Sequence, residues 1–141
     1  MVRKMLFSSE QNANTVSWLL LAARLVFGIL LLSHGIQKFN SFDQMSSAFP
    51  DPLGVGSNIS LILAIFAELI CSIGFILGLL YRLAMLPMIF TMLVAFFVIH
   101  AKDPFAVKEL AFIYLIVFIL MYIAGPGKYS IDSFLFTKTD K

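Results

Sequence analysis

The sequence contains few of the residues that soluble enzymes use for chemistry. One cysteine, Cys71, and two histidines occur among 141 residues. A disulfide framework, a CxxC redox pair and a thiolate metal site within one chain are therefore excluded, and no metal site is expected. The sequence also lacks a glycine-rich phosphate loop, a dinucleotide fingerprint, an HExxH pair and a GxSxG elbow.

Charge is equally scarce. Charged residues make up 13% of the chain, whereas a soluble domain usually has about a quarter. The net charge of +2 is small and forms no basic stripe, which argues against a nucleic-acid partner. Hydrophobic residues reach 60%. This composition predicts an all-α integral membrane protein whose main partner is the lipid bilayer.

Four apolar runs approach the roughly 20 residues that a membrane-spanning helix needs. They are Val16–Ile36, Ile59–Leu80, Leu83–His100 and Lys108–Ala124. We therefore predict a four-helix bundle over residues 16–134, with a polar N-terminal tail at 1–15 and a C-terminal tail at 135–141. The long connection Lys38–Asn58 contains three phenylalanines, which favour packing back onto the bundle.

An even number of spans puts both termini on one side of the membrane. The loops and tails on that side contain more basic residues than those on the other side. They hold Arg3, Lys4, Arg82, Lys128, Lys138 and Lys141, against Lys38, Lys102 and Lys108 opposite. The positive-inside rule therefore predicts that both termini are cytoplasmic.

Two charges interrupt the apolar runs, Arg24 in the first and Glu68 in the second. A charge near the bilayer centre costs at least ~2.5–3.5 kcal/mol, so such residues normally face the protein interior. Because their signs are opposite, we predict that Arg24 and Glu68 form a buried pair. The pair would either clamp two helices together or form a polar, proton-handling site.

Small residues predict where the helices pack. Arg24, Gly28, Leu31, Gly35 and Lys38 share one helical face, which should turn towards other helices. Gly74 and Gly78 form a small-xxx-small motif in the second run and should also lie at a helix contact.

A second polar cluster is predicted near the outer ends of the helices. Its members are His34, Lys38, His100, Lys102 and Glu109. These groups could donate hydrogen bonds to a quinone carbonyl or a phospholipid phosphate. The alternative is ordinary capping and snorkelling at the interface, which we favour for Lys102. Histidines on two helices could also ligate haem, but both lie at helix ends, and haem is the less favoured cofactor.

The sequence resembles the DoxX family of small bacterial four-helix membrane proteins. The resemblance rests on Arg24-Leu-Val-Phe-Gly28, Ser33-His34-Gly35-Ile-Gln-Lys38-Phe39, Ala67-Glu68, Gly74, Gly78, Arg82, His100, Glu109 and Gly125-Pro126-Gly127-Lys128-Tyr129-Ser130-Ile131-Asp132. It spans roughly residues 17–134.

The resemblance implies a protein of the bacterial inner membrane that is linked to respiratory or redox processes. Some family members are described as membrane subunits of quinone-linked oxidoreductases or as partners in oxidative-stress complexes. The first hypothesis is therefore a membrane redox component that binds quinone, a membrane or periplasmic redox protein, or a second copy of the chain. A non-catalytic scaffold or assembly subunit is the second hypothesis, and a small transporter is the third.

Overall fold

The computed structural model describes residues 12–136, and within this range every regular element is a helix. Most of the two predicted polar tails, residues 1–11 and 137–141, lies outside the described residues. The basic residues Arg3, Lys4, Lys138 and Lys141 belong to these parts of the chain.

Four segments within residues 12–136 are long and apolar enough to cross a membrane. They are α2 (Ala13–Asn40), α4–η1–α5 (Ser57–Ile65, Phe66–Ile70 and Cys71–Leu77), α6–η2 (Tyr81–Val94 and Ala95–Ile99) and α7 (Phe105–Ala124). The segments η1 and η2 are single π-helical turns. Two short helices, α3 (Phe42–Met45) and α8 (Ile131–Phe136), lie outside the spans. The prediction of an all-α, four-helix membrane protein is confirmed.

The helix boundaries differ from the predicted ones in informative ways. Helix α2 continues to Asn40, about one turn past the predicted end at Ile36, since the prediction followed the apolar run and the helix extends into the polar residues after it. Helix α5 ends at Leu77, since Gly78 adopts a left-handed conformation with φ +65°. Gly78 therefore terminates the helix, and it also packs closely at a helix contact, since an added Cβ would clash with Arg24 Nη1 of α2 and lie 2.5 Å from Ser130 Cβ. Gly74 packs at the turn, where an added Cβ would lie 3.2 Å from Cβ of Ala84.

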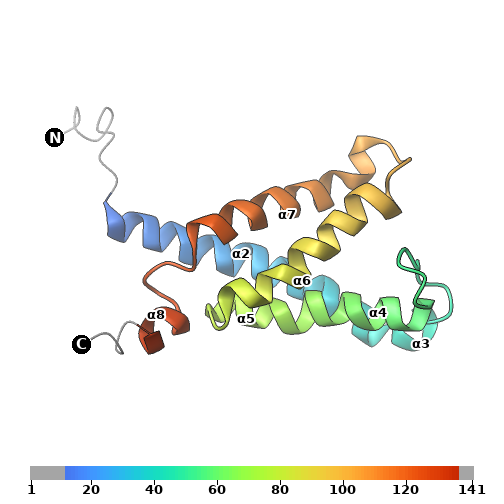
Figure 1. The fold of residues 1–141 in the computed structure, drawn as a ribbon, viewed down its shortest axis with the longest axis horizontal. Helices are drawn as coiled ribbons and strands as arrows, with labels where there is room; N and C mark the ends of the chain where they lie inside the picture. Colours follow the sequence, from blue (N-terminus) through green and yellow to red (C-terminus); the bar gives the residue numbers. More distant parts are fainter. Residues whose placement is uncertain (1–11, 137–141) are drawn as a thin grey trace.

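The four spans run alternately in opposite directions, so both ends of the described chain lie at one end of the bundle (Figure 1). We call this the terminal end. Helix α3, the start of α4 and the α7 start lie at the opposite end (Figure 1). Helix α2 contacts the whole second span, while α6 packs against both α5 and α7.

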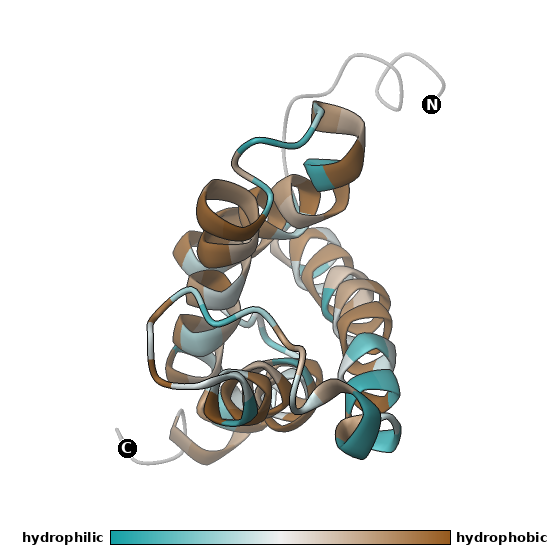
Figure 2. Ribbon diagram, turned by 90° about the vertical axis from the view of Figure 1, so that its right-hand side faces the viewer, coloured by the Kyte–Doolittle hydropathy of each residue, from teal (hydrophilic) through white to brown (hydrophobic). Residues whose placement is uncertain are grey.

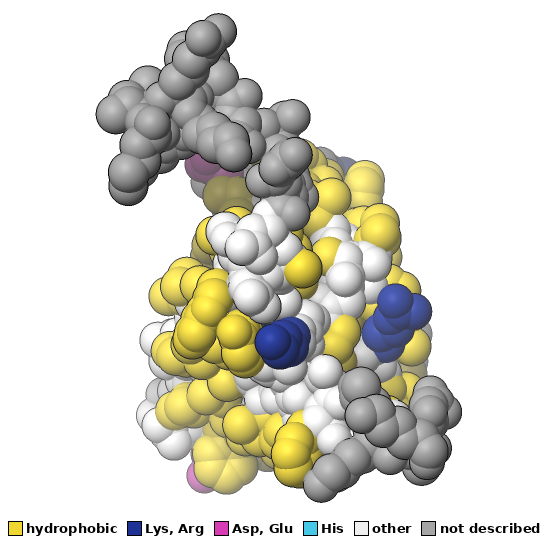
Figure 3. Space-filling view, turned by 90° about the vertical axis from the view of Figure 1, so that its left-hand side faces the viewer, with side chains coloured by type: hydrophobic (Ala, Val, Ile, Leu, Met, Phe, Trp, Pro, Cys, Tyr) yellow, Lys and Arg dark blue, Asp and Glu magenta, His cyan; other side chains and the backbone are white. Residues whose placement is uncertain are grey.

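The outer surface of the bundle is apolar. The hydropathy colouring shows largely hydrophobic helices, with hydrophilic stretches mainly at the helix ends and in the connections (Figure 2). Viewed on the terminal end, basic side chains stand out among apolar ones (Figure 3). Large apolar residues such as Leu19, Leu83 and Ile123 are 65%, 63% and 70% exposed. Such exposure on every span fits a surface that contacts lipid.

The core of the bundle is built around aromatic rings near the terminal end. Phe75 is fully buried and stacks on Tyr81, with ring centroids 5.6 Å apart. Phe118 from α7 meets Phe75 edge-on at 5.4 Å. The Tyr81 hydroxyl donates to the Met121 carbonyl at 3.1 Å, so its polar tip is satisfied.

One glycine sets how closely the first two spans approach. A Cβ on Gly35 would lie 2.7 Å from both the Glu68 carbonyl carbon and the Leu69 nitrogen. Backbone therefore meets backbone at this point, as small residues allow in membrane bundles. Gly28 is different, because its Cβ would meet the Ile76 and Phe75 side chains.

We expect Gly35→Ala to lower the thermal stability of the detergent-purified protein. Overpacking against a fixed backbone typically costs about 1–3 kcal/mol, more than the roughly 1 kcal/mol that alanine gains in helix propensity. Gly74→Ala is the matched control, because it gains the same propensity and its added Cβ would have looser contacts, 3.1 Å to the Leu79 oxygen and 3.2 Å to Ala84 Cβ. A melting temperature equal for Gly35→Ala and Gly74→Ala would contradict the close backbone contact.

Candidate functional site

The buried charge of α2 nearest the terminal end, Arg24, binds the C-terminal segment. Its side chain is 1% exposed. Nη1 donates to the Pro126 carbonyl at 2.9 Å, and Nη2 donates to the Tyr129 carbonyl. The predicted ion pair with Glu68 is therefore wrong. The turn after α7 turns its carbonyl oxygens towards the guanidinium, which needs many acceptors.

The same C-terminal segment also caps a membrane helix. The Asp132 carboxylate accepts from the Leu80 and Tyr81 amides at 2.9 and 2.8 Å, at the start of α6. The Tyr129 ring lies 4.5 Å from the Trp18 ring of α2. Arg24 thus helps to connect α2, the segment after α7 and the start of α6. This is the structural clamp that was one of the two predicted roles, but its acceptors are backbone carbonyls and not the Glu68 carboxylate.

Glu68 pairs with a different cation. Lys38 Nζ lies 2.5 Å from Glu68 Oε2, and the side chains are 22% and 7% exposed. Glu68 pairs with Lys38 and not with Arg24 because of its position along the α2 axis. Gly35 touches the Glu68 backbone, and Arg24 lies 11 residues earlier on α2, about 16 Å away along the helix axis. Lys38 is less than one turn beyond Gly35 and reaches Glu68 easily.

Glu68 also lies in the π-helical turn η1, in the middle of the second span. Within this turn the Cys71 amide bonds to the Phe66 carbonyl, five residues back. Such a turn inserts an extra residue into a helix, and π-bulges are frequent at functional sites. The second π-helical turn, η2, ends at Ile99 beside the same region.

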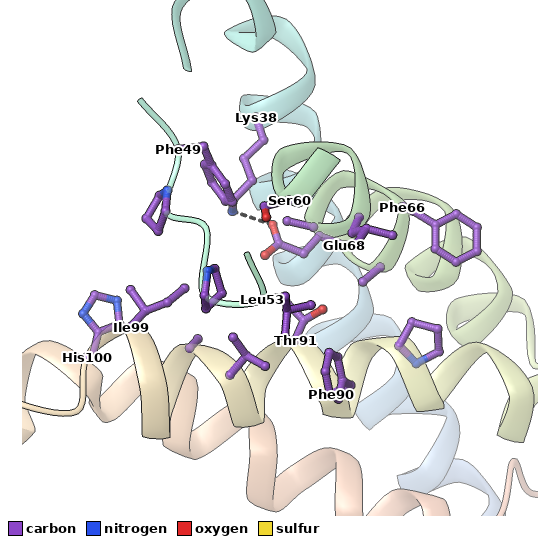
Figure 4. A pocket seen from close by; sticks show the side chains of 18 residues that line it. Lys38, Phe49, Leu53, Ser60, Phe66, Glu68, Phe90, Thr91, Ile99 and His100 are labelled. Carbon is purple, nitrogen blue, oxygen red and sulfur yellow. Dashed lines mark hydrogen bonds and ion pairs between the residues drawn. The ribbon is translucent and has the colours of Figure 1, made fainter. Parts of the chain in front are cut away.

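A cavity of about 490 Å³ opens next to the Lys38–Glu68 pair, between the second and third spans (Figure 4). Its walls are mainly apolar, and the connection after α3 contributes Phe49, Pro50, Pro52 and Leu53. Five polar side chains line it, namely Lys38, Ser60, Glu68, Thr91 and His100. This volume lies in the range of small-molecule sites, which are typically apolar with a few polar groups.

Part of the cavity wall belongs to the exposed outer surface of the spans. Phe66 and Phe90 line the cavity, yet they remain 46% and 52% exposed on membrane-spanning helices. A ligand dissolved in lipid can therefore approach between α4–η1 and α6 without crossing water.

Asp51 orders the connection that covers the cavity. Its Oδ1 accepts from the Ser60 hydroxyl at 2.7 Å and from the Val55 amide at 3.0 Å, and Oδ2 accepts from the Gly56 amide at 2.8 Å. The Ser60 hydroxyl and then the Gly56 amide hold the pKa of Asp51 below its usual value. The loop is thus fixed to the start of α4, and its phenylalanine Phe49 packs over the cavity.

The predicted outer cluster divides between different surroundings. His100 lines the cavity, and its Nδ1 lies 2.7 Å from Asp103 Oδ2. His34 does not line it and instead meets the Tyr114 ring edge-on, with centroids 6.3 Å apart. Glu109 and Lys102 are exposed and do not line the cavity either. Of this cluster, only Lys38 and His100 come together with Glu68.

Sequence reasoning missed Ser60, Thr91 and the covering loop as parts of the site. Ser60 and Thr91 are isolated polar residues inside apolar spans, which was the available signal. Among residues 12–136, no group of three histidine, cysteine or acidic side chains could hold a metal ion.

Comparison with protein families identifies a match over more than half of the chain. The sequence model described as DoxX matches residues 19–101, which is 83 of the 141 residues and contains Arg24, Lys38, Glu68 and His100. Comparison with curated proteins and comparison with solved structures return no match.

A double-mutant cycle distinguishes the two possible partners of Glu68. We expect Lys38→Met and Glu68→Gln each to destabilise the protein, because each leaves a buried charge unpaired. The double variant should recover part of the loss, with a coupling of about 1–3 kcal/mol in unfolding experiments. Arg24→Met combined with Glu68→Gln is the control, and its effects should add. Coupling of Glu68 to Arg24 but not to Lys38 would contradict the observed pairing.

Proposed function

Since the chain belongs to the DoxX family, we propose that it is a membrane redox component that binds a quinone-type ligand in the cavity beside Lys38 and Glu68. The observation that supports this most directly is the position of an ion pair at the inner wall of an apolar cavity that opens to lipid. A quinone combines an oxygen-bearing head with an apolar tail. The polar residues of the cavity suit the head, and its apolar walls suit the tail.

The polar residues suit the head of such a ligand. Lys38 has three N–H donors and uses one of them on Glu68, while His100 adds a ring nitrogen at the other side of the cavity. Quinone carbonyls are acceptors. The isoprenoid tail would leave between Phe66 and Phe90 into the bilayer. In this role Arg24 stabilises the bundle and does not touch the ligand.

A partner is part of this proposal, because electrons need a donor or acceptor outside the chain. We propose a membrane or periplasmic redox protein, with a second copy of the chain as the alternative. A scaffold or assembly subunit without chemistry remains the second candidate function, and the extensive structural use of Arg24 favours it.

Purified protein should carry quinone. We expect solvent extraction of protein prepared in native lipid to release quinone at a sizeable fraction of one molecule per chain. His100→Ala should lower this occupancy, because His100 lines the cavity, whereas His34→Ala should leave it unchanged, because His34 packs elsewhere. If the protein carries no quinone and added quinone does not raise its melting temperature, the scaffold function replaces the redox one.

We also propose that the protein lies in the bacterial inner membrane with both termini in the cytoplasm, following the distribution of basic residues. The cavity then lies towards the periplasmic side.

Cysteine labelling tests this orientation. In a Cys71→Ala background, we expect Asn58→Cys to react with a membrane-impermeant maleimide in intact cells, whereas Lys128→Cys should react only after lysis. Both side chains are exposed. Asn58 lies in the first turn of α4, and Lys128 lies between α7 and α8, so the two residues belong to opposite ends of the bundle. The reverse pattern would overturn the orientation, and labelling of both in intact cells would contradict it as well.

A further inference from the structure

The Glu68 carboxylate has one oxygen without a hydrogen-bond donor. The residue is 5% exposed, and only Oε2 is bonded, to Lys38. No hydrogen bond within residues 12–136 reaches Oε1. In Figure 4 this second oxygen points away from Lys38 and into the cavity.

A carboxylate oxygen in an apolar site favours a donor, because leaving it unpaired costs free energy. None of the other polar side chains that line the cavity donates to Oε1. The Ser60 hydroxyl gives its proton to Asp51, and Nδ1 of His100 is paired with Asp103. Oε1 is therefore open to a donor on a molecule that occupies the cavity.

The charges of the site restrict the occupant further. Glu68 neutralises Lys38, so the inner wall of the cavity has no net positive charge to offer. A phosphate headgroup would meet an ionised carboxylate and be repelled. A neutral head that carries both a hydroxyl donor and an oxygen acceptor satisfies Glu68 Oε1 and the remaining Lys38 donors together.

We propose that the cavity selects the reduced, hydroxyl-bearing form of its quinone-type ligand, with Glu68 Oε1 accepting the hydrogen bond of a quinol hydroxyl. This inference rests on the proposed function. It goes beyond that function because an oxidised quinone has carbonyl acceptors only and leaves Oε1 unpaired. Lys38 is a binding residue as well, since it holds the carboxylate through Oε2 and donates to the other side of the head.

Three ligands of nearly equal size test the selection. Wild-type protein in lipid nanodiscs would be titrated anaerobically with decylubiquinone, with decylubiquinol, and with the quinol whose two hydroxyls are methylated. We expect the quinol to bind about tenfold more tightly than the other two, as one hydrogen bond to a charged acceptor provides. The dimethyl ether retains the ring and tail but has no donor, so it isolates the hydroxyl.

The variant Glu68→Gln provides a second test of the same selection. In Glu68→Gln the side-chain amide can donate as well as accept, so the preference for the quinol should disappear while the fold is checked by helicity and melting temperature. His34→Ala should keep the preference. Equal affinities for all three ligands in wild type would overturn the inference and leave the proposed function standing. Failure of all three to bind would overturn both.

Discussion

The need to satisfy polar groups in the absence of water governs this bundle. Helix α2 brings two cations into the protein interior, Arg24 near the terminal end and Lys38 near the other. Neither could be left unpaired within hydrocarbon. Arg24 draws the segment after α7 back across the bundle by binding its carbonyls, and Lys38 meets the acid of the second span. Hydrogen bonds to these two charges therefore hold the helices in place as much as apolar packing does. Apolar contacts alone favour helix association weakly, because apolar side chains can pack against lipid equally well.

The two cations have different consequences because their partners differ. Arg24 bonds to backbone carbonyls, which are fixed by the turn at Pro126 and cannot titrate or move independently. The arrangement closes the terminal end. Lys38 bonds to a side chain that retains an unused oxygen and borders a cavity. Gly35 makes the second arrangement possible, since any larger residue would push Glu68 away from α2. The polar centre beside this cavity therefore lies at the end remote from the termini.

Much of the fold was predictable from hydropathy alone, including four spans and the burial of Arg24 and Glu68. The pairing was not, because it depends on relative depth. The opposite signs of Arg24 and Glu68 suggested a pair, whereas the true register follows from the Gly35 contact with the Glu68 backbone and the helix end at Gly78. The cavity was also beyond sequence reasoning. It depends on a loop whose conformation Asp51 fixes through amides four and five residues later.

The π-helical turns lie where close packing and the cavity meet. A π-helical turn holds one residue more than an α-helical turn, so the side chains after it face another direction than in a regular helix. Glu68 lies in η1, and its backbone rests against Gly35 while its carboxylate reaches both Lys38 and the cavity. The second turn, η2, ends at Ile99, directly before His100, and both residues line the same cavity. The two local departures from α geometry in the second and third spans thus coincide with the place where a tight helix contact borders an accessible acid.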